Sequence, residues 1–310
     1  MNKPTIVVTA PIPPELREVL AQDNELVEFA GDAVMPGHDV AVTTSIAGAG
    51  ATLFGRLPDL RLLLCNGTGL ENIDLGEAAR RGIVVRNTPD EVTDDTADFA
   101  IGLLYAVSRR IAEADRFMRS GRWLKERMSP SRRVFDRAIG IVGLGKIGQT
   151  IARRAAGIGM TVLYTGPRAK PALPYEYVAA IGDLAERCDA LVLSCPGGPE
   201  THHIVDAGVL GRLGTDGILI NVSRGSVVND DDLLAALETK AIGGAGLDVF
   251  ATEPAFDPRL AAYETVVLAP HYAAVTRETR YGIANTLAGA TADFHAGRPV
   301  PDAAAKHGRA

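Results

Sequence analysis

The sequence has few cysteines and no long hydrophobic run. Its three cysteines, Cys65, Cys188 and Cys195, are too scattered for a disulfide framework, and no Cys-x-x-Cys pair suggests a metal knuckle or a redox site. Because nowhere do about 18 uncharged apolar residues follow one another, we expect no membrane-spanning helix. The short apolar run at 5–8 is followed by prolines and is shorter than the core of a signal peptide. These absences favour a reducing, cytoplasmic location.

The chain also lacks a strong charge of either sign. Its 38 acidic and 32 basic side chains give a net charge of −6, too mild for an acidic tail and of the wrong sign for a general nucleic-acid binder. Hydrophobic residues make up 46% and charged residues 23%, an ordinary globular composition. A length of 310 residues is enough for two domains, each with its own core.

Short β-branched or apolar runs alternate with helical patterns along the chain. The first part has expected strands at 5–8, 40–44, 62–65 and 83–85, with helical stretches at 15–20, 50–57 and 75–81. One long helical pattern then covers 93–119, and a polar, arginine-rich stretch covers 120–137. Six further strands are expected at 139–142, 161–164, 190–194, 218–222, 244–247 and 266–268. This alternation predicts an α/β protein with parallel sheets, and six strands complete a doubly wound dinucleotide fold.

A glycine pattern, G-x-G-x-x-G, lies between the expected strand at 139–142 and the helical run at 149–158. Gly143 permits a tight turn, Gly145 lets a pyrophosphate approach the backbone, and Gly148 allows the helix to pack against the strand. A phosphate-binding loop of the nucleotide-triphosphate type is excluded, because Lys146 is followed by Ile147 and not by Ser or Thr. The alternative is a glycine-rich turn that serves another ligand.

The end of the second strand of this series carries no acidic residue. An NAD site usually has Asp or Glu there, about 20 residues after the glycines, to bind the ribose 2′-hydroxyl. This sequence has Thr165, Gly166 and Arg168 instead, which favours NADP: Arg168 is a partner for the 2′-phosphate and Thr165 a hydrogen-bond donor. Arg168 as a solvated loop charge is the alternative.

Four chemically active residues follow the later strands. Arg224 comes after 218–222, Asp248 and Glu253 after 244–247, and His271 after 266–268. The carboxyl ends of parallel strands face one crevice, so these side chains can converge on one ligand. An Arg can bind a carboxylate, a His can exchange a proton near neutral pH, and a Glu can orient the imidazole and favour its charged form. Taken singly, such residues are more often structural.

Several ordered motifs resemble the D-isomer-specific 2-hydroxyacid dehydrogenase family. They lie at 66–75, 81–89, 96–98, 143–148, 221–225, 246–254 and 270–271. The resemblance implies two Rossmann-like domains with a cleft between them. The flavodoxin-like substrate domain would comprise 1–94 and 280–310, and the dinucleotide-binding domain 95–279. It also implies a homodimer.

The same resemblance implies roles for individual residues. Arg224 would bind the carboxylate and carbonyl oxygen of the substrate, His271 would be the acid/base, and Glu253 would be its partner. The backbone of Gly67, Thr68 and Gly69 would hold the substrate carboxylate, and Asp248 the nicotinamide amide. Further cofactor contacts, besides His271, would be Thr96, Leu144, Lys146, Ile147, Gly166, Cys195, Pro196, Thr201, Val222 and Ala273. Cys195 is thus interpreted as packing beside the cofactor and not as a nucleophile, since no neighbouring motif supplies a base.

Departures from the family pattern are informative. The missing acid near Thr165 resembles the NADP-preferring glyoxylate and hydroxypyruvate reductase branch, and Glu253 argues against the formate dehydrogenase branch. Ala273 and Ala274 replace a glycine-containing stretch after the histidine. Trp123 matches an aromatic position that can reach a substrate pocket, in its own subunit or the other; a core or interface position is the alternative.

Two other conspicuous groups are interpreted as structural. Asp230, Asp231 and Asp232 after Asn229 predict a capped helix start and not a metal cluster. His202 and His203 lack a spaced partner ligand, so a surface turn is expected and no metal is predicted.

The resulting hypothesis is an NADPH-dependent reductase of small 2-oxo acids, such as glyoxylate or hydroxypyruvate, that forms D-2-hydroxy acids by hydride transfer. NADP is preferred and NAD is possible. Neither nucleic acid nor a membrane is an expected partner. The alternatives are a nucleotide-sensing binding protein on the same scaffold and an NAD-dependent dehydrogenase that works in the oxidative direction.

Overall fold

The computed structural model describes residues 3–306, so positions 1, 2 and 307–310, which the predicted substrate domain includes, lie outside the described residues. Its residues form two compact units. Unit 1 holds the segment up to Val92 and the segment from Val275 onward, and unit 2 is Thr93–Ala274. The division falls a few residues before each predicted boundary, at 94 and 280.

Unit 1 contains a five-stranded sheet in the order β2-β1-β3-β4-β5, all parallel. The strands are β1 (Thr5–Val8), β2 (Glu25–Glu28), β3 (Val40–Thr44), β4 (Leu62–Asn66) and β5 (Val84–Arg86). The helices are α1 (Pro14–Asp23), α2 (Ala51–Arg56), α3 (Leu75–Arg81) and α10 (Arg277–His295), with a 3-10 turn, η4 (Ala304–Lys306). This strand order is the flavodoxin-like one, as predicted.

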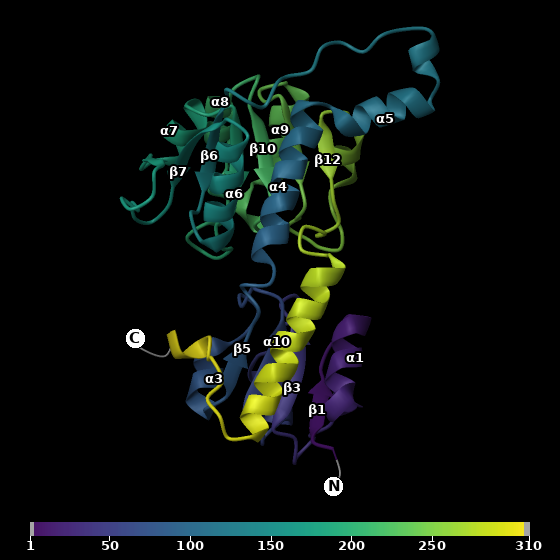
Figure 1. Ribbon diagram of the computed structural model, residues 1–310, viewed down its shortest axis with the longest axis vertical. Coiled ribbons are helices and arrows are strands. Elements are labelled where there is room, and N and C mark those ends of the chain that lie inside the picture. The colour runs from purple at the N-terminus through teal and green to yellow at the C-terminus, as the bar shows by residue number, and fades with distance from the viewer. Residues whose placement is uncertain (1–2, 307–310) are drawn as a thin grey trace. The chain divides into compact units, whose positions relative to one another are not determined.

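Helices cover both faces of this sheet. Along β4, Leu63 and Cys65 pack with Phe54 of α2 and Ala78 of α3. On the other side, α1 packs along α10 (Figure 1). Because both faces are covered, β3 and β4 read as nearly continuous apolar runs, and this made them recognisable in the sequence.

Unit 2 contains seven parallel strands in the order β12-β11-β10-β9-β6-β7-β8. The strands are β6 (Ala138–Val142), β7 (Thr161–Thr165), β8 (Glu176–Tyr177), β9 (Ala190–Leu193), β10 (Ile218–Asn221), β11 (Gly244–Leu247) and β12 (Val266–Leu268). The helices are α4 (Thr93–Ser108), α5 (Ile111–Arg119), α6 (Lys146–Gly157), α7 (Ile181–Glu186), α8 (Ala207–Leu213) and α9 (Asp230–Glu238), with 3-10 turns η1 (Arg122–Leu124), η2 (Gly225–Val227) and η3 (Pro258–Ala262). The order reverses at β6, and β6 leads into the glycine motif.

The core of unit 2 has two layers, one on each face of the sheet. Ala100 and Leu104 of α4 pack with Ile151 of α6 on one face. Leu184, Leu210 and Leu233, from α7, α8 and α9, belong to the cluster on the other face. The acid-rich start of α9 is capped as predicted, because Asn229 accepts hydrogen bonds from the N–H groups of Asp231 and Asp232.

The single long helix predicted for 93–119 is wrong. The chain breaks after α4, and Arg110 adopts a left-handed conformation with φ of 54° before α5 begins. The guanidinium of Arg110 pairs with the buried carboxylate of Glu113 and donates to Ser129 Oγ at 2.7 Å. These contacts hold the break, and α5 runs in a different direction from α4 (Figure 1). The edge strands β2 and β8 were also not predicted.

Candidate active site

His271 and Glu253 form a hydrogen-bonded pair in unit 2. His271 lies in the loop after β12 and Glu253 in the loop after β11. The Nδ1 atom of His271 is 2.7 Å from Glu253 Oε2, and Glu253 Oε1 accepts the backbone N–H of Phe250 at 2.9 Å. The His271 side chain is 41% exposed, so its ring remains accessible for proton exchange.

The environment of Glu253 favours its ionised form. Burial of the carboxyl acts to raise its pKa, but hydrogen bonds from His271 and from the Phe250 N–H outweigh burial, so the pKa of Glu253 lies below its usual 4.5. The positive charge of Arg224 acts in the same direction. Near neutral pH Glu253 is therefore a carboxylate, and it holds the ring of His271 through Nδ1.

Arg224 reaches this pair from the loop after β10. Its Nη1 donates to Ser223 O at 2.7 Å, and its backbone carbonyl accepts from Asn221 Nδ2 at 3.0 Å. The adjacent turn packs closely, because a Cβ on Gly225 would lie 1.9 Å from the carbonyl carbon of Phe250. The structure thus brings the three predicted catalytic residues together.

Gly197 is a residue that sequence reasoning missed. A Cβ at this position would lie 2.9 Å from Arg224 Cγ. Glycine therefore leaves room for the aliphatic stem of Arg224. In the sequence, the Gly197-Gly198 pair after Pro196 is the feature that could have indicated this position.

The glycine motif has the geometry that its pattern predicted. Gly143 has φ of 90°, and Gly145 is the N-cap of α6. A Cβ on Gly148 would lie 2.1 Å from Gly143 O, whereas nothing lies within 4 Å of a Cβ on Gly145. The open side at Gly145 and the helix N-terminus beyond it, with Leu144, Lys146 and Ile147 around them, fit the pyrophosphate of a dinucleotide.

The loop after β9 packs directly against the glycine motif. A Cβ on Gly143 would lie 2.7 Å from the Cα of Cys195, and Thr201 Oγ1 donates to Pro196 O at 2.7 Å. Burial raises the pKa of the Cys195 thiol. Cys195 thus packs against the glycine motif, and its contact with the cofactor stays a prediction.

At the end of β7 the structure differs from one prediction. Thr165 is buried, and its hydroxyl donates to Ala179 O at 3.2 Å instead of facing outward. This contact does not support the prediction that the Thr165 hydroxyl donates a hydrogen bond to NADP. Gly166 has open space where a Cβ would project, and Arg168 is exposed. Lys170, which we did not predict, donates from Nζ to Leu144 O at 2.6 Å and places a cation at the glycine loop.

Other predicted cofactor residues are buried in unit 2. Asp248 is 1% exposed, and its two carboxylate oxygens accept the backbone N–H groups of Tyr272 and Ala273 at 2.6 and 2.9 Å. Thr96 in α4 and Val222 after β10 are also buried.

The predicted substrate loop belongs to unit 1. Gly67, Thr68 and Gly69 follow β4, and Gly67 has φ of 125°. The loop is fixed by the buried Thr88, whose N–H donates to Gly67 O at 3.1 Å, and by Asn87 Nδ2, which donates to Thr68 O at 2.8 Å.

Trp123 lies in η1, and its side chain belongs to none of the core clusters of the described chain. It is 49% exposed, Arg127 stacks over its ring at 5.4 Å, and the neighbouring Leu124 is 85% exposed. The core alternative is therefore excluded for the described chain, and the pocket and interface alternatives remain.

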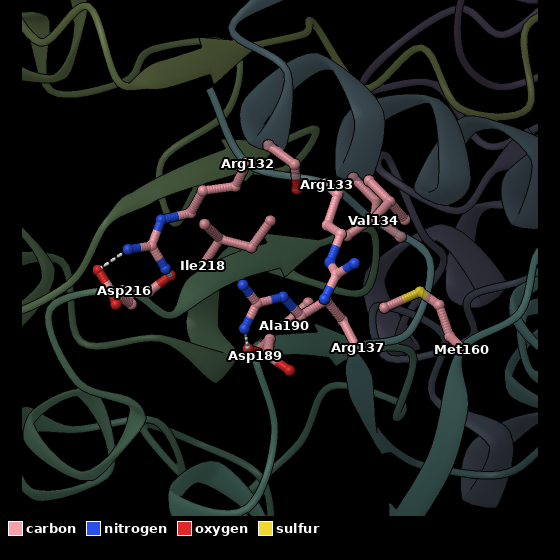
Figure 2. A pocket seen from close by; sticks show the side chains of 11 residues that line it. Arg132, Arg133, Val134, Arg137, Met160, Asp189, Ala190, Asp216 and Ile218 are labelled. Carbon is pink, nitrogen blue, oxygen red and sulfur yellow. Dashed lines mark hydrogen bonds and ion pairs between the residues drawn. The ribbon is translucent and has the colours of Figure 1, made fainter. Parts of the chain in front are cut away.

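A separate shallow recess lies at the amino ends of β6, β9 and β10, opposite to the ends that carry the catalytic residues (Figure 2). Its arginines pair with aspartates of the same unit: Arg132 with Asp216, and Arg137 with Asp189 at 3.0 Å. These pairs tie the chain before β6 to the segments that precede β9 and β10. The recess contains none of the predicted site residues.

Comparison with known proteins decides the family. The sequence profile of the D-isomer specific 2-hydroxyacid dehydrogenase NAD binding domain matches residues 101–273. The chain belongs to this family. It is accordingly an NAD(P)-dependent oxidoreductase.

Relatives of known activity cover most of this dehydrogenase. It is 42% identical to glyoxylate/hydroxypyruvate reductase A of Arabidopsis thaliana, with 80% of this chain and 79% of the relative aligned. It is 37% identical to 2-ketogluconate reductase of Gluconobacter oxydans, with 92% and 94% aligned. A solved NADPH-dependent glyoxylate/hydroxypyruvate reductase from Sinorhizobium meliloti, in complex with NADP and malonate, superimposes with a TM-score of 0.91 at 33% identity over 98% of each chain.

Among residues 3–306, no helix is long and apolar enough to cross a membrane. Within the same residues, no group of three His, Cys, Asp or Glu side chains is arranged to hold a metal ion.

Proposed function

We propose that this dehydrogenase catalyses the NADPH-dependent reduction of small 2-oxo acids, such as glyoxylate or hydroxypyruvate, to D-2-hydroxy acids. The observation that carries the proposal is the His271–Glu253 pair at 2.7 Å, with Arg224 beside it, in the same unit as the glycine loop. The names of the aligned reductases support this substrate class.

His271, Glu253 and Arg224 each have a distinct role in the proposed reaction. Because Nδ1 of His271 is held by Glu253, the opposite nitrogen, Nε2, is the atom that donates a proton to the carbonyl oxygen of the substrate. Arg224 binds the substrate carboxylate and meets the negative charge that develops on that oxygen. Glu253 keeps the imidazolium ring oriented and balances its charge. The bound cofactor supplies the hydride that the carbonyl carbon accepts.

The backbone of Gly67, Thr68 and Gly69 would hold the substrate carboxylate as well. Thr88 and Asn87 support this role, since they fix the loop in one conformation without a ligand.

A preference for NADPH is supported by the charges beside the glycine loop. Thr165, at the end of β7, is followed by no carboxylate that would repel a 2′-phosphate, and Arg168 is exposed there. Lys170, whose Nζ donates to the carbonyl oxygen of Leu144, adds positive charge at the glycine loop.

We further propose a cytoplasmic homodimer. The three cysteines are free thiols, which suits a reducing compartment. Exposed apolar side chains that a partner subunit could cover occur along α5 and the segment after it: Met118, Trp123, Leu124 and Phe135 are each about half exposed or more. Sedimentation of the wild type and of L124D tests this; a monomeric wild type would contradict it.

The reaction itself is tested by the loss of reduced-nicotinamide absorbance. Glyoxylate, hydroxypyruvate, pyruvate and phenylpyruvate are each supplied with NADPH and with NADH. We expect rapid turnover with NADPH and a small 2-oxo acid. A preference for NADH would overturn the cofactor assignment alone, whereas tight NADPH binding with no turnover would favour a nucleotide-sensing protein.

A further inference from the structure

The backbone at His271 has an unusual conformation. Its φ is 53°, in the left-handed region that residues with a side chain seldom adopt. Such a conformation persists only where surrounding contacts hold it. The contacts around this loop therefore decide where the imidazole points.

Asp248 supplies three of these contacts. Its backbone carbonyl accepts the N–H of His271 at 2.8 Å, its Oδ1 accepts the N–H of Tyr272 at 2.6 Å, and its Oδ2 accepts the N–H of Ala273 at 2.9 Å. The N–H of Asp248 in turn donates to Asn221 O at 3.0 Å. One residue thus ties the loop of His271 to the end of β10, which leads to Arg224.

The location of the carboxylate agrees with such a role. Asp248 is 1% exposed, and burial raises the pKa of its carboxyl although the N–H groups of Tyr272 and Ala273 act against that rise. A buried carboxylate is tolerated when donors satisfy its oxygens, and here both oxygens bind the backbone of one loop.

We propose that Asp248 is a positioning residue for His271: its carboxylate holds residues 271–273 in the conformation that presents Nδ1 to Glu253. This inference rests on the proposed function for its catalytic meaning. It differs from the contact with the nicotinamide amide that the family resemblance implies, because it acts in the protein without cofactor.

The test uses Asp248→Asn and a matched control, Asp206→Ala. Asparagine keeps the size of the side chain but has one acceptor oxygen, so it leaves one of the two N–H groups facing an NH₂ group. Asp206 also accepts a backbone N–H, that of Val209 at 3.0 Å, but at the N-cap of α8. In both variants a backbone N–H loses the carboxylate oxygen that accepts its hydrogen bond. Only Asp248 contacts the loop of His271.

The first measurement is the nuclear magnetic resonance signal of the His271 ring in the cofactor-free protein, assigned by its absence from H271A. We expect the signal in D248N to move in the same direction as in E253Q, where the partner carboxylate is lost, and to stay unchanged in D206A. In D248N, kcat should fall about a hundredfold, which is the size of effect known for small displacements of a reacting group.

The second measurement is the dissociation constant for NADP and for adenosine 2′,5′-bisphosphate, which lacks the nicotinamide. An unmoved His271 signal in D248N would overturn the proposal, whether or not NADP binds more weakly. If D248N does not fold, D248S, which keeps one hydroxyl acceptor, serves in its place. Because the resonance needs neither cofactor nor substrate, a moved signal without turnover would refute the proposed reaction and leave the positioning role intact.

Discussion

Replacement of Glu253 by glutamine tests the central pair most directly. The amide oxygen of glutamine can still accept the Phe250 N–H, which Glu253 Oε1 now accepts at 2.9 Å, so the loop keeps its local support. The variant loses the negative charge 2.7 Å from His271 Nδ1. E253Q therefore removes an electrostatic contribution with little change in shape.

The magnitude follows from the exposure of the two side chains. A hydrogen bond to a charged group contributes about 1.5–3 kcal/mol. The His271 and Glu253 side chains are 41% and 21% exposed, so solvent screening places the value near the lower end, at about 1.5–2 kcal/mol. At 1.36 kcal/mol per factor of ten, kcat for glyoxylate should fall about 10- to 30-fold.

The assay is kcat and KM for glyoxylate and NADPH across the pH range. Because Glu253 does not contact the substrate in the proposed mechanism, KM should change by less than about threefold while kcat falls. The exposed Glu238 at the end of α9 provides the control E238Q, which should behave as the wild type. An unchanged kcat in E253Q would refute the role of Glu253.

Further predictions follow from individual groups. The pKa of Glu253 in the folded state is lowered from 4.5, so the stabilisation that its carboxylate contributes is present above that pH and is lost as pH falls through the lowered value. The difference in unfolding free energy between wild type and E253Q, measured in urea, should therefore shrink in acid. A difference that stays constant with pH would contradict this. R224A should lower kcat by about a hundredfold or more, because it removes a donor to the developing oxyanion; a loss of tenfold or less in single-turnover rates would exclude that role. R168A should raise KM for NADPH about tenfold and leave KM for NADH unchanged, and an equal effect on both would remove Arg168 from phosphate recognition. Burial raises the pKa of Cys65 and of Cys188 to about 12, so iodoacetamide at pH 8 should alkylate them roughly a thousandfold more slowly in the folded than in the unfolded protein, as followed by mass spectrometry; comparable rates would contradict their burial.

Much of the fold could be predicted because burial leaves a pattern. The strands of both sheets are covered on two faces, so runs such as 62–65 and 218–220 are continuously apolar. The glycine motif was predictable because two of its glycines answer separate steric needs, a left-handed turn at Gly143 and a close approach at Gly148. The edge strand β2 is only half buried and β8 has two residues, so neither produced such a pattern.

The break between α4 and α5 shows the limit of periodicity. The spacing of apolar residues in 93–119 indicates which helix face is buried. It does not predict the backbone conformation of a single residue. Arg110 is neither glycine nor proline, and its left-handed conformation is held by Glu113 and by Ser129, of which Ser129 is too distant in the sequence for a local pattern to pair it with Arg110. The direction of the hydroxyl of Thr165 was equally hidden, since its acceptor, Ala179, lies across a loop.

The sequence by itself determined which residues stand at the carboxyl ends of strands, and therefore that Arg224, Asp248 and His271 share one edge of a parallel sheet. Strand ends can be recognised locally, because a buried apolar run gives way to polar residues. Only the tertiary structure decided what those residues do for one another: that Glu253 meets Nδ1 of His271, and that both oxygens of Asp248 hold the loop behind it. These bonds join loops that follow different strands, and their lengths depend on the packing of the whole unit and not on any stretch of sequence.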